Sequence, residues 1–282
     1  MARSPSVCDH FRMMRVALVS DVFFDDPEGK RLRDRLSEAR ALGAEIAVLP
    51  EIPLNPWSPA TQECFDDDAE PTNGPRAKLQ SQTAREVGIG LLGGAIVIGE
   101  DGRRRNTALV FGPDGTLLGS YAKCHIPEEP GFHESHHYDP GMEFATPIQV
   151  LDMPLGVQIC SDANRPQGTQ VLAAMGAELV VVPRSTELAT WHRWRPVIIS
   201  SAITCCCYVA TVNRPSPEQG VDIGGPSFAV APDGTVLLET DDVVGVFEVD
   251  RSVMSRFRRE YPGYIAVRSD LYHGAWKRVC EE

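Results

Sequence analysis

Three stretches, far apart in the chain, each place one reactive side chain at or near the end of an apolar run: AEIAVLPE (44–51) ends on Glu51, SYAKCHIPEEPGFHE (120–134) carries Lys123, and GVQICSDANRP (156–166) carries Cys160. A thiol, an amine and a carboxylate are the groups needed for covalent hydrolysis of a carbon–nitrogen bond. The thiol supplies the nucleophile, the carboxylate takes and returns its proton, and the ammonium stabilises the oxyanion. The three stretches therefore predict a hydrolase with a cysteine nucleophile.

The composition is that of a single folded enzyme domain. At 282 residues and 43% hydrophobic content, the chain is long enough to bury a full core. A net charge of −12 argues against nucleic acid or an anionic membrane surface as a partner. Since no linker-like segment interrupts the apolar pattern, we expect one domain over residues 15–282, after a flexible N-terminal extension over residues 1–14.

The eight cysteines do not form the paired spacings of a disulfide framework. Cys205, Cys206 and Cys207 are consecutive and are interpreted as small apolar filling of a helix. No stretch reaches the roughly 18 apolar residues of a membrane span. The first residues, MARSPSVCDHFRMM, lack the apolar core of a signal peptide. We therefore expect a cytoplasmic protein with no membrane partner.

Apolar runs alternate with amphipathic segments along most of the chain. The expected strands cover residues 15–24, 44–51, 88–100, 155–160, 177–183, 208–214 and 243–250. The expected helices cover residues 29–43, 75–88, 164–176, 194–207 and 251–260, and an extended tail follows. Hairpins are expected around the Pro-Asp-Gly turns at 113–115 and 232–234, and these two turns are a weak sign of two related halves. The pattern is typical of mixed sheets covered by helices.

Each reactive residue has an ordinary structural explanation when it is considered alone. Cysteines are often buried in cores, an isolated glutamate is usually a solvated loop acid, and a lysine stem often lies along a sheet. The turn 161–164 favours the functional interpretation of Cys160. It exposes the thiol and frees backbone N–H groups, so the N–H of Ser161 can contribute to an oxyanion hole.

Considered together, the motifs resemble those of the nitrilase superfamily of carbon–nitrogen hydrolases over roughly residues 15–250. Three matches carry the resemblance: Pro50 before the base Glu51, the G-x-x-x-K spacing from Gly119 to Lys123 after the first hairpin, and the C-x-D turn of Cys160 and Asp162. The resemblance implies an α/β fold that is a four-layer αββα sandwich with two mixed β-sheets. It also implies a homodimer or higher homo-oligomer, with the C-terminal tail from about residue 251 at the dimer interface.

The resemblance further implies a reaction. An enzyme of the amidase or N-carbamoyl amidohydrolase branch would cleave a small linear amide or N-carbamoyl compound through a cysteine thioester and release ammonia. Glu51 would be the base, and Lys123 with the Ser161 N–H would bind the oxyanion. The segment 130–134 resembles the one in which the family carries a second glutamate, so Glu134 would help to place Lys123 and the substrate. This chemistry requires no cofactor and no metal.

Three residues are candidates for substrate binding. Arg165 and Arg184 could pair with a substrate carboxylate, although either could equally form a surface ion pair. His133 belongs to the segment that carries Glu134. A metal site at His133, His136 and His137 is disfavoured, because adjacent histidines on one loop lack a matched Cys or His pair.

Other functions remain open at this stage. A true nitrilase would use the same three residues on a nitrile carbon. A non-catalytic family member would bind an amide or a protein partner without turnover, and its Cys160 would lack the rapid reaction with iodoacetamide expected of an activated thiolate. A redox or metal protein would use the remaining cysteines and histidines. The glycine pattern at 88–93 is not a dinucleotide site, because it follows a helix and opens a strand.

Overall fold

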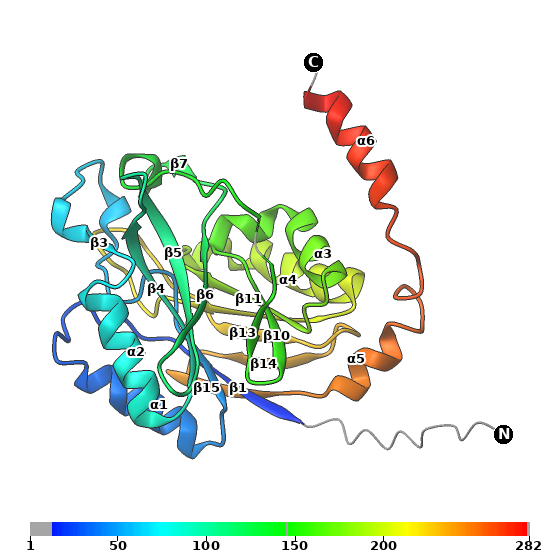
Figure 1. Ribbon diagram of the computed structural model, residues 1–282, viewed down its shortest axis with the longest axis horizontal. Helices are drawn as coiled ribbons and strands as arrows, with labels where there is room; N and C mark the ends of the chain where they lie inside the picture. Colours follow the sequence, from blue (N-terminus) through cyan, green and yellow to red (C-terminus); the bar gives the residue numbers. More distant parts are fainter. Residues whose placement is uncertain (1–12, 145, 281–282) are drawn as a thin grey trace.

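The computed structural model describes residues 13–144 and 146–280. Two β-sheets and the helices around them form its body, and the C-terminal segment leads away from it (Figure 1). Most of the predicted N-terminal extension, residues 1–12, lies outside the described residues. The first strand begins at Met14, one residue earlier than expected.

The first sheet contains strands from both ends of the chain. Its members are β1 (Met14–Val19), β2 (Ile46–Val48), β3 (Ala69–Pro71), β4 (Gly90–Ile98), β5 (Arg104–Phe111), β6 (Leu117–Ala122) and β15 (Val244–Val249). The order is β15-β1-β2-β4-β5-β6, with β3 paired to β4. Strands β1, β2 and β4 run parallel, whereas β5, β6 and β15 pair antiparallel to their neighbours. The hairpin predicted around residues 113–115 is the β5–β6 pair.

The second sheet repeats this pattern. Its members are β9 (Ile148–Val150), β10 (Met153–Val157), β11 (Leu179–Arg184), β12 (Tyr208–Asn213), β13 (Ser227–Val230) and β14 (Val236–Thr240). Strands β10, β11 and β12 run parallel, and β9, β13 and β14 pair antiparallel. The run β10-β11-β12-β13-β14 therefore has the connectivity of β1-β2-β4-β5-β6, and β9 corresponds to β15. This topology supports the two related halves suggested by the Pro-Asp-Gly turns.

Alternating side chains on β1 show how the layers are arranged. Val16 and Leu18 belong to the large core that also contains side chains of the second sheet, α3 and α4. Ala17 and Val19 belong to a separate core shared with α1 and α2. The layers are therefore helices, first sheet, second sheet and helices, which confirms the predicted αββα sandwich with two mixed sheets.

Glycine and proline mark some of the helix ends. The helices are α1 (Lys30–Ala41), α2 (Pro75–Val87), α3 (Pro166–Ala174), α4 (Trp191–Cys205), α5 (Arg251–Phe257) and α6 (Ser269–Cys280). Helix α2 starts on Pro75 and stops at Gly88, whose φ of 69° is readily adopted by glycine. Cys206 ends α4 with a φ of 50°, and Cys207 is fully buried, in agreement with an apolar filling role.

The C-terminal tail differs in part from the prediction. It leads away from the body as expected, but its last part is helix α6 instead of extended chain (Figure 1). The side chains of Leu271, Tyr272 and Trp276 on α6 are more than half exposed. Apolar side chains that are exposed on a helix are unfavourable in water. Among the described residues, no helix is long and apolar enough to cross a membrane.

Candidate active site

Glu51, Lys123 and Glu134 form one buried cluster. Lys123 Nζ lies 2.8 Å from Glu51 Oε1 and donates to both carboxylate oxygens of Glu134, at 2.8 and 2.5 Å. The side chains of all three residues are inaccessible to solvent. The amide of Asn106 also donates to Glu51 Oε1, at 2.7 Å. The other oxygen, Glu51 Oε2, is buried and has no hydrogen-bond partner among the described residues, so it is free to accept a proton.

The charges in this cluster shift the pKa values of Lys123 and Glu134. Burial by itself lowers the pKa of Lys123, but the carboxylates of Glu134 and Glu51 outweigh it and raise that pKa. Burial raises the pKa of Glu134, with Lys123 opposing it and Glu51 adding to it. Lys123 is therefore a fixed cation at neutral pH, which suits the stabilisation of an oxyanion.

The backbone at Glu51 is strained and is held by a buried arginine. Ile52, the next residue, has a φ of 38°, a conformation that costs a β-branched residue energy. Arg214 Nη1 donates to the carbonyl oxygens of Glu51 and Ile52, both at 3.0 Å, and Nη2 donates to that of Asn55 at 2.9 Å. Arg214 thereby orients the turn that presents the Glu51 carboxylate.

Cys160 is the first residue of a short 3-10 helix, η4 (Cys160–Asn164), and has a φ of 47°. Its side chain is buried, with Sγ 3.8 Å from the carbonyl oxygen of Ser185. Burial raises the pKa of the thiol, Glu51 raises it further, and Lys123 opposes them. The resting nucleophile is therefore a thiol that needs a base.

Asp162 joins the nucleophile turn to the loop that carries Lys123. Its Oδ2 accepts from the Tyr121 hydroxyl at 2.8 Å and from the Ile159 N–H at 3.1 Å. Its Oδ1 accepts from the N–H groups of Cys124 and His125, at 3.2 and 2.9 Å, and lies 2.7 Å from His125 Nδ1. One buried carboxylate thus fixes residues on both sides of the site. The hydroxyl of Ser161 adds a bond to the carbonyl oxygen of His125.

A cavity of about 240 Å³ opens onto Cys160. Its lining residues come from the hairpin β7 (Glu128–Glu129) and β8 (Phe132–His133) with the residue before it, from η4, from the segment between β11 and α4, and from the start of α4: Pro127, Glu129, Phe132, Cys160, Ser161, Asn164, Ser185, Thr186, Glu187, Thr190, Arg193 and Trp194. The hydroxyl of Ser185 is buried without a partner among the described residues, so it is available to a substrate amide. The cavity is smaller than drug-sized sites of roughly 300–1,000 Å³, which limits it to small molecules.

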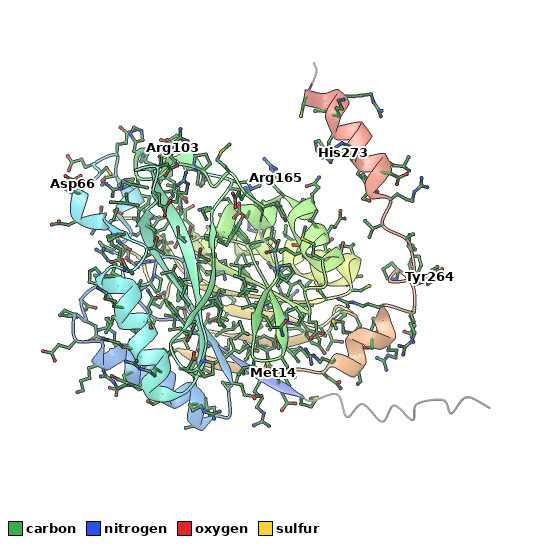
Figure 2. All side chains as sticks on the ribbon, in the orientation of Figure 1. Met14, Asp66, Arg103, Arg165, Tyr264 and His273 are labelled. Carbon is green, nitrogen blue, oxygen red and sulfur yellow. The ribbon has the colours of Figure 1, made fainter. Side chains whose placement is uncertain are left out.

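The predicted substrate-binding residues lie elsewhere. Arg165 is exposed at the surface and does not line the cavity (Figure 2). Arg184 is fully buried and bonds Thr211, Thr186 and the Pro226 carbonyl oxygen, so it holds loops together behind the cavity wall. His133 bonds Glu128 at 2.7 Å and does not line the cavity either. The arginine that lines the cavity is Arg193, which the sequence analysis did not select.

The histidine segment does not assemble a metal site. Within residues 13–144 and 146–280, no group of three or more His, Cys, Asp or Glu side chains is arranged to hold a metal ion. His133 and His136 share Glu128, at 2.7 and 3.7 Å. His137 instead contacts the carbonyl oxygen of Thr61 through Nε2, at 2.7 Å.

Asn106 and Arg214 belong to none of the predicted motifs, and Asp162 has no predicted role beyond the C-x-D turn. One signal could have found Arg214, because it directly follows the buried strand β12. Asn106 lies between Arg105 and Thr107 in the polar first half of β5, and it is buried there. No sequence signal identifies Arg193, since its position on the cavity depends on how α4 packs.

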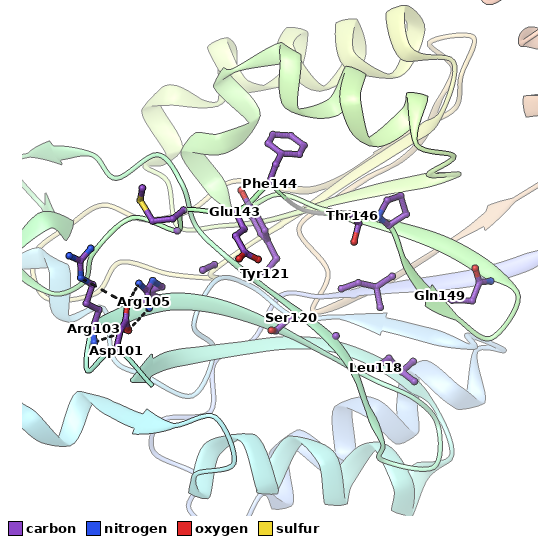
Figure 3. A pocket seen from close by; sticks show the side chains of 16 residues that line it. Asp101, Arg103, Arg105, Leu118, Ser120, Tyr121, Glu143, Phe144, Thr146 and Gln149 are labelled. Atoms are coloured by element: carbon purple, nitrogen blue, oxygen red, sulfur yellow. Dashed lines mark hydrogen bonds and ion pairs between the residues drawn. The ribbon is translucent and has the colours of Figure 1, made fainter. Parts of the chain in front are cut away.

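A larger cavity of about 750 Å³ lies beside β6 but contains none of Glu51, Lys123 and Cys160 (Figure 3). One end carries the ion pair of Arg105 with Asp101, at 2.6 Å. Since Cys160 lines the smaller cavity, that cavity is the candidate active site.

Comparison with known proteins identifies relatives over most of the chain. The model of the carbon–nitrogen hydrolase family matches residues 27–259. The omega-amidase NIT2 of Homo sapiens is 32% identical over 249 residues, covering 84% of this chain and 88% of the relative. The crystal structure of a carbon–nitrogen hydrolase from Helicobacter pylori G27 has a TM-score of 0.85 at 23% identity, with 95% and 99% coverage. An amidase from Nesterenkonia sp. AN1 has a TM-score of 0.75 at 25% identity, with 93% and 99% coverage.

Replacement of Asp162 tests its role in joining the two loops. We expect Asp162→Asn to lower kcat for amide hydrolysis by about tenfold to a hundredfold, because an amide cannot accept all five bonds and small displacements of reacting groups are costly. Steady-state kinetics with a thermal unfolding control would measure this. Asp139→Asn is the matched control, since Asp139 is exposed. An unchanged kcat in Asp162→Asn would contradict the role.

Replacement of Glu51 tests the state of the thiol. Because the Glu51 carboxylate raises the pKa of Cys160, we expect Glu51→Gln to lower that pKa while abolishing hydrolysis. The pH dependence of iodoacetamide labelling at Cys160, followed by mass spectrometry, reports the thiol pKa. Cys205, whose pKa burial raises to about 11, is the internal reference. An unchanged or higher Cys160 pKa in the variant would contradict the proximity of the two groups.

Proposed function

The chain belongs to the carbon–nitrogen hydrolase family, and on that premise we propose that it hydrolyses a small linear amide through a thioester on Cys160. One observation carries the proposal. The buried cluster of Lys123 with Glu51 and Glu134 leaves Glu51 Oε2 unpaired in the site that holds the Cys160 thiol. A free base, a fixed cation and a protonated nucleophile are the requirements for general-base-assisted attack.

In the first half of the reaction, Glu51 takes the proton of Cys160 as Sγ attacks the carbonyl carbon. The carbonyl oxygen becomes an oxyanion, which Lys123 Nζ and the Ser161 N–H stabilise. The tetrahedral intermediate collapses, the carbon–nitrogen bond breaks, and Glu51 returns the proton to the departing ammonia. Glu134 keeps Lys123 charged and in place. The product of this half is the thioester.

In the second half, water enters where ammonia left. Glu51 takes a proton from the water, whose oxygen attacks the thioester carbon. The second tetrahedral intermediate expels the Cys160 sulfur, which regains its proton from Glu51. The carboxylic acid product leaves, so one amide and one water yield one acid and one ammonia, with no cofactor.

The proposed substrate is an ω-amide, an amide whose other end carries a carboxylate. Two considerations support it. The omega-amidase relatives cover more than four fifths of the chain. Arg193, an exposed residue that lines the Cys160 cavity, is suited to pair with a carboxylate. An N-carbamoyl compound or a nitrile is the competing substrate class for the same three residues.

We also propose a setting for the enzyme. Residues 15–282 would act as one functional domain in a homodimer or higher oligomer, with the tail from about residue 251 packed against the partner. The exposed apolar side chains of α6 support this arrangement.

The seven cysteines of the described chain are free thiols, which favours the cytoplasm. Disulfides in protein isolated from its native cells would contradict that location.

Removal of the nucleophile tests the proposed function. We expect wild-type protein to release ammonia from ω-amides, and Cys160→Ala to release none, because no thioester can form. A panel of uncharged amides, ω-amides, N-carbamoyl compounds and nitriles, assayed for ammonia, would measure this. Activity that survives in Cys160→Ala would reject the thiol mechanism. A wild-type preference for nitriles would reject the amide assignment.

Truncation of the tail tests the oligomer. We expect a chain that ends at residue 258 to lose the native oligomeric state, because it lacks α6 and its apolar side chains. Sedimentation of the full chain and of the truncated chain at matched concentrations would show the difference. A full chain that sediments as a monomer would contradict the proposed interface.

A further inference from the structure

The wall of the Cys160 cavity carries charges of both signs. Arg193 comes from the first turn of α4, Glu187 precedes that helix, and Glu129 comes from β7. Among residues 13–144 and 146–280, no hydrogen bond or ion pair engages any of these three side chains. Unpaired charges beside a reactive group are available to a ligand, whereas structural charges are normally paired.

The backbone positions of these charges are fixed. Glu187 pairs with Ile223 in a β-bridge, and its carbonyl oxygen accepts from the Thr190 hydroxyl at 2.7 Å and from the Thr190 N–H at 3.0 Å. Glu129 pairs with Phe132 across the β7–β8 hairpin. The two carboxylates therefore line the cavity on the hairpin (Glu129) and on the segment before α4 (Glu187). The cation, Arg193, lines it on α4 itself.

A substrate with only a carboxylate would use Arg193 but would be repelled by Glu187 and Glu129. A substrate with only an ammonium group would leave Arg193 unpaired and repelled. A molecule with both groups satisfies both signs, because its carboxylate meets Arg193 and its ammonium group meets a glutamate.

We propose that this cavity selects ω-amides of α-amino acids, whose far end carries a carboxylate and an ammonium group together. Arg193 binds the carboxylate, and Glu187 with Glu129 binds the ammonium group. The inference rests on the proposed amide hydrolysis and refines its substrate class. The ω-carbonyl then lies at Cys160, and hydrolysis yields the acidic amino acid and ammonia.

Four amides of one chain length test the inference: L-glutamine, glutaric acid monoamide, 5-aminopentanamide and pentanamide. We expect kcat/KM for ammonia release to be about tenfold or more higher for glutamine than for each of the others, since a charge-assisted hydrogen bond to a substrate contributes on this scale. A monoamide that surpasses glutamine would overturn the inference and leave the proposed function intact. Failure to hydrolyse any of the four would overturn both.

Variants test the cation and the carboxylates separately. For each protein, the kcat/KM for glutamine is divided by the kcat/KM for a second substrate, so that a general loss of activity cancels. Arg193→Gln should reduce the preference for glutamine over 5-aminopentanamide by about tenfold, and Glu187→Gln or Glu129→Gln should reduce the preference over the monoamide. Glu128→Gln is the matched control on the same hairpin, because Glu128 bonds His133 instead of lining the cavity. Ratios that stay at the wild-type value in the Arg193 and glutamate variants would refute the assignment.

Discussion

The buried charge of Lys123 is the constraint on which the site depends. An ammonium group without solvent is stable only with partners that replace its hydration, and Glu51 and Glu134 are those partners. Two carboxylates around one ammonium leave an excess of negative charge next to Cys160, which helps to keep the thiol protonated. The same arrangement that buries the lysine therefore prepares a base and a nucleophile that react together.

The second requirement is that loops from the two sheets keep fixed positions relative to one another. Glu51 follows β2 of the first sheet and Cys160 follows β10 of the second, so the site lies across the junction of the two halves. Arg214, which follows β12, reaches over to the Glu51 turn, and Asp162 reaches from the Cys160 turn to the Lys123 loop. Both connections are buried, where each hydrogen bond is stronger than at the surface. The positive φ values of Ile52 and Cys160 persist because these contacts compensate for their strain.

Much of this architecture could be predicted from the sequence. The apolar runs and glycine-terminated helices locate most strands and helices, and the ends of the runs locate Glu51, Lys123 and Cys160. The family resemblance predicted that Glu134 helps to place Lys123. In the structure, the Glu134 carboxylate accepts hydrogen bonds from Lys123 Nζ. Arg165, Arg184 and His133, which were predicted to bind substrate, do not line the Cys160 cavity. A long polar side chain near a strand end can point to solvent, into a loop or into a cavity, and local sequence does not distinguish these directions.

The sequence by itself determined that mixed sheets are covered by helices, because strand and helix periodicities are local properties and their alternation allows few architectures. The second sheet was expected only from the family resemblance. The sequence also determined the types of reactive group, since these are simply residues of the chain. The tertiary structure alone decided that Glu51 Oε2 is unpaired and that the thiol is protonated at rest. It also decided that Arg193, Glu187 and Glu129 share a cavity. These are properties of distance and solvation between residues remote in sequence, which exist only after the sheets and helices have packed.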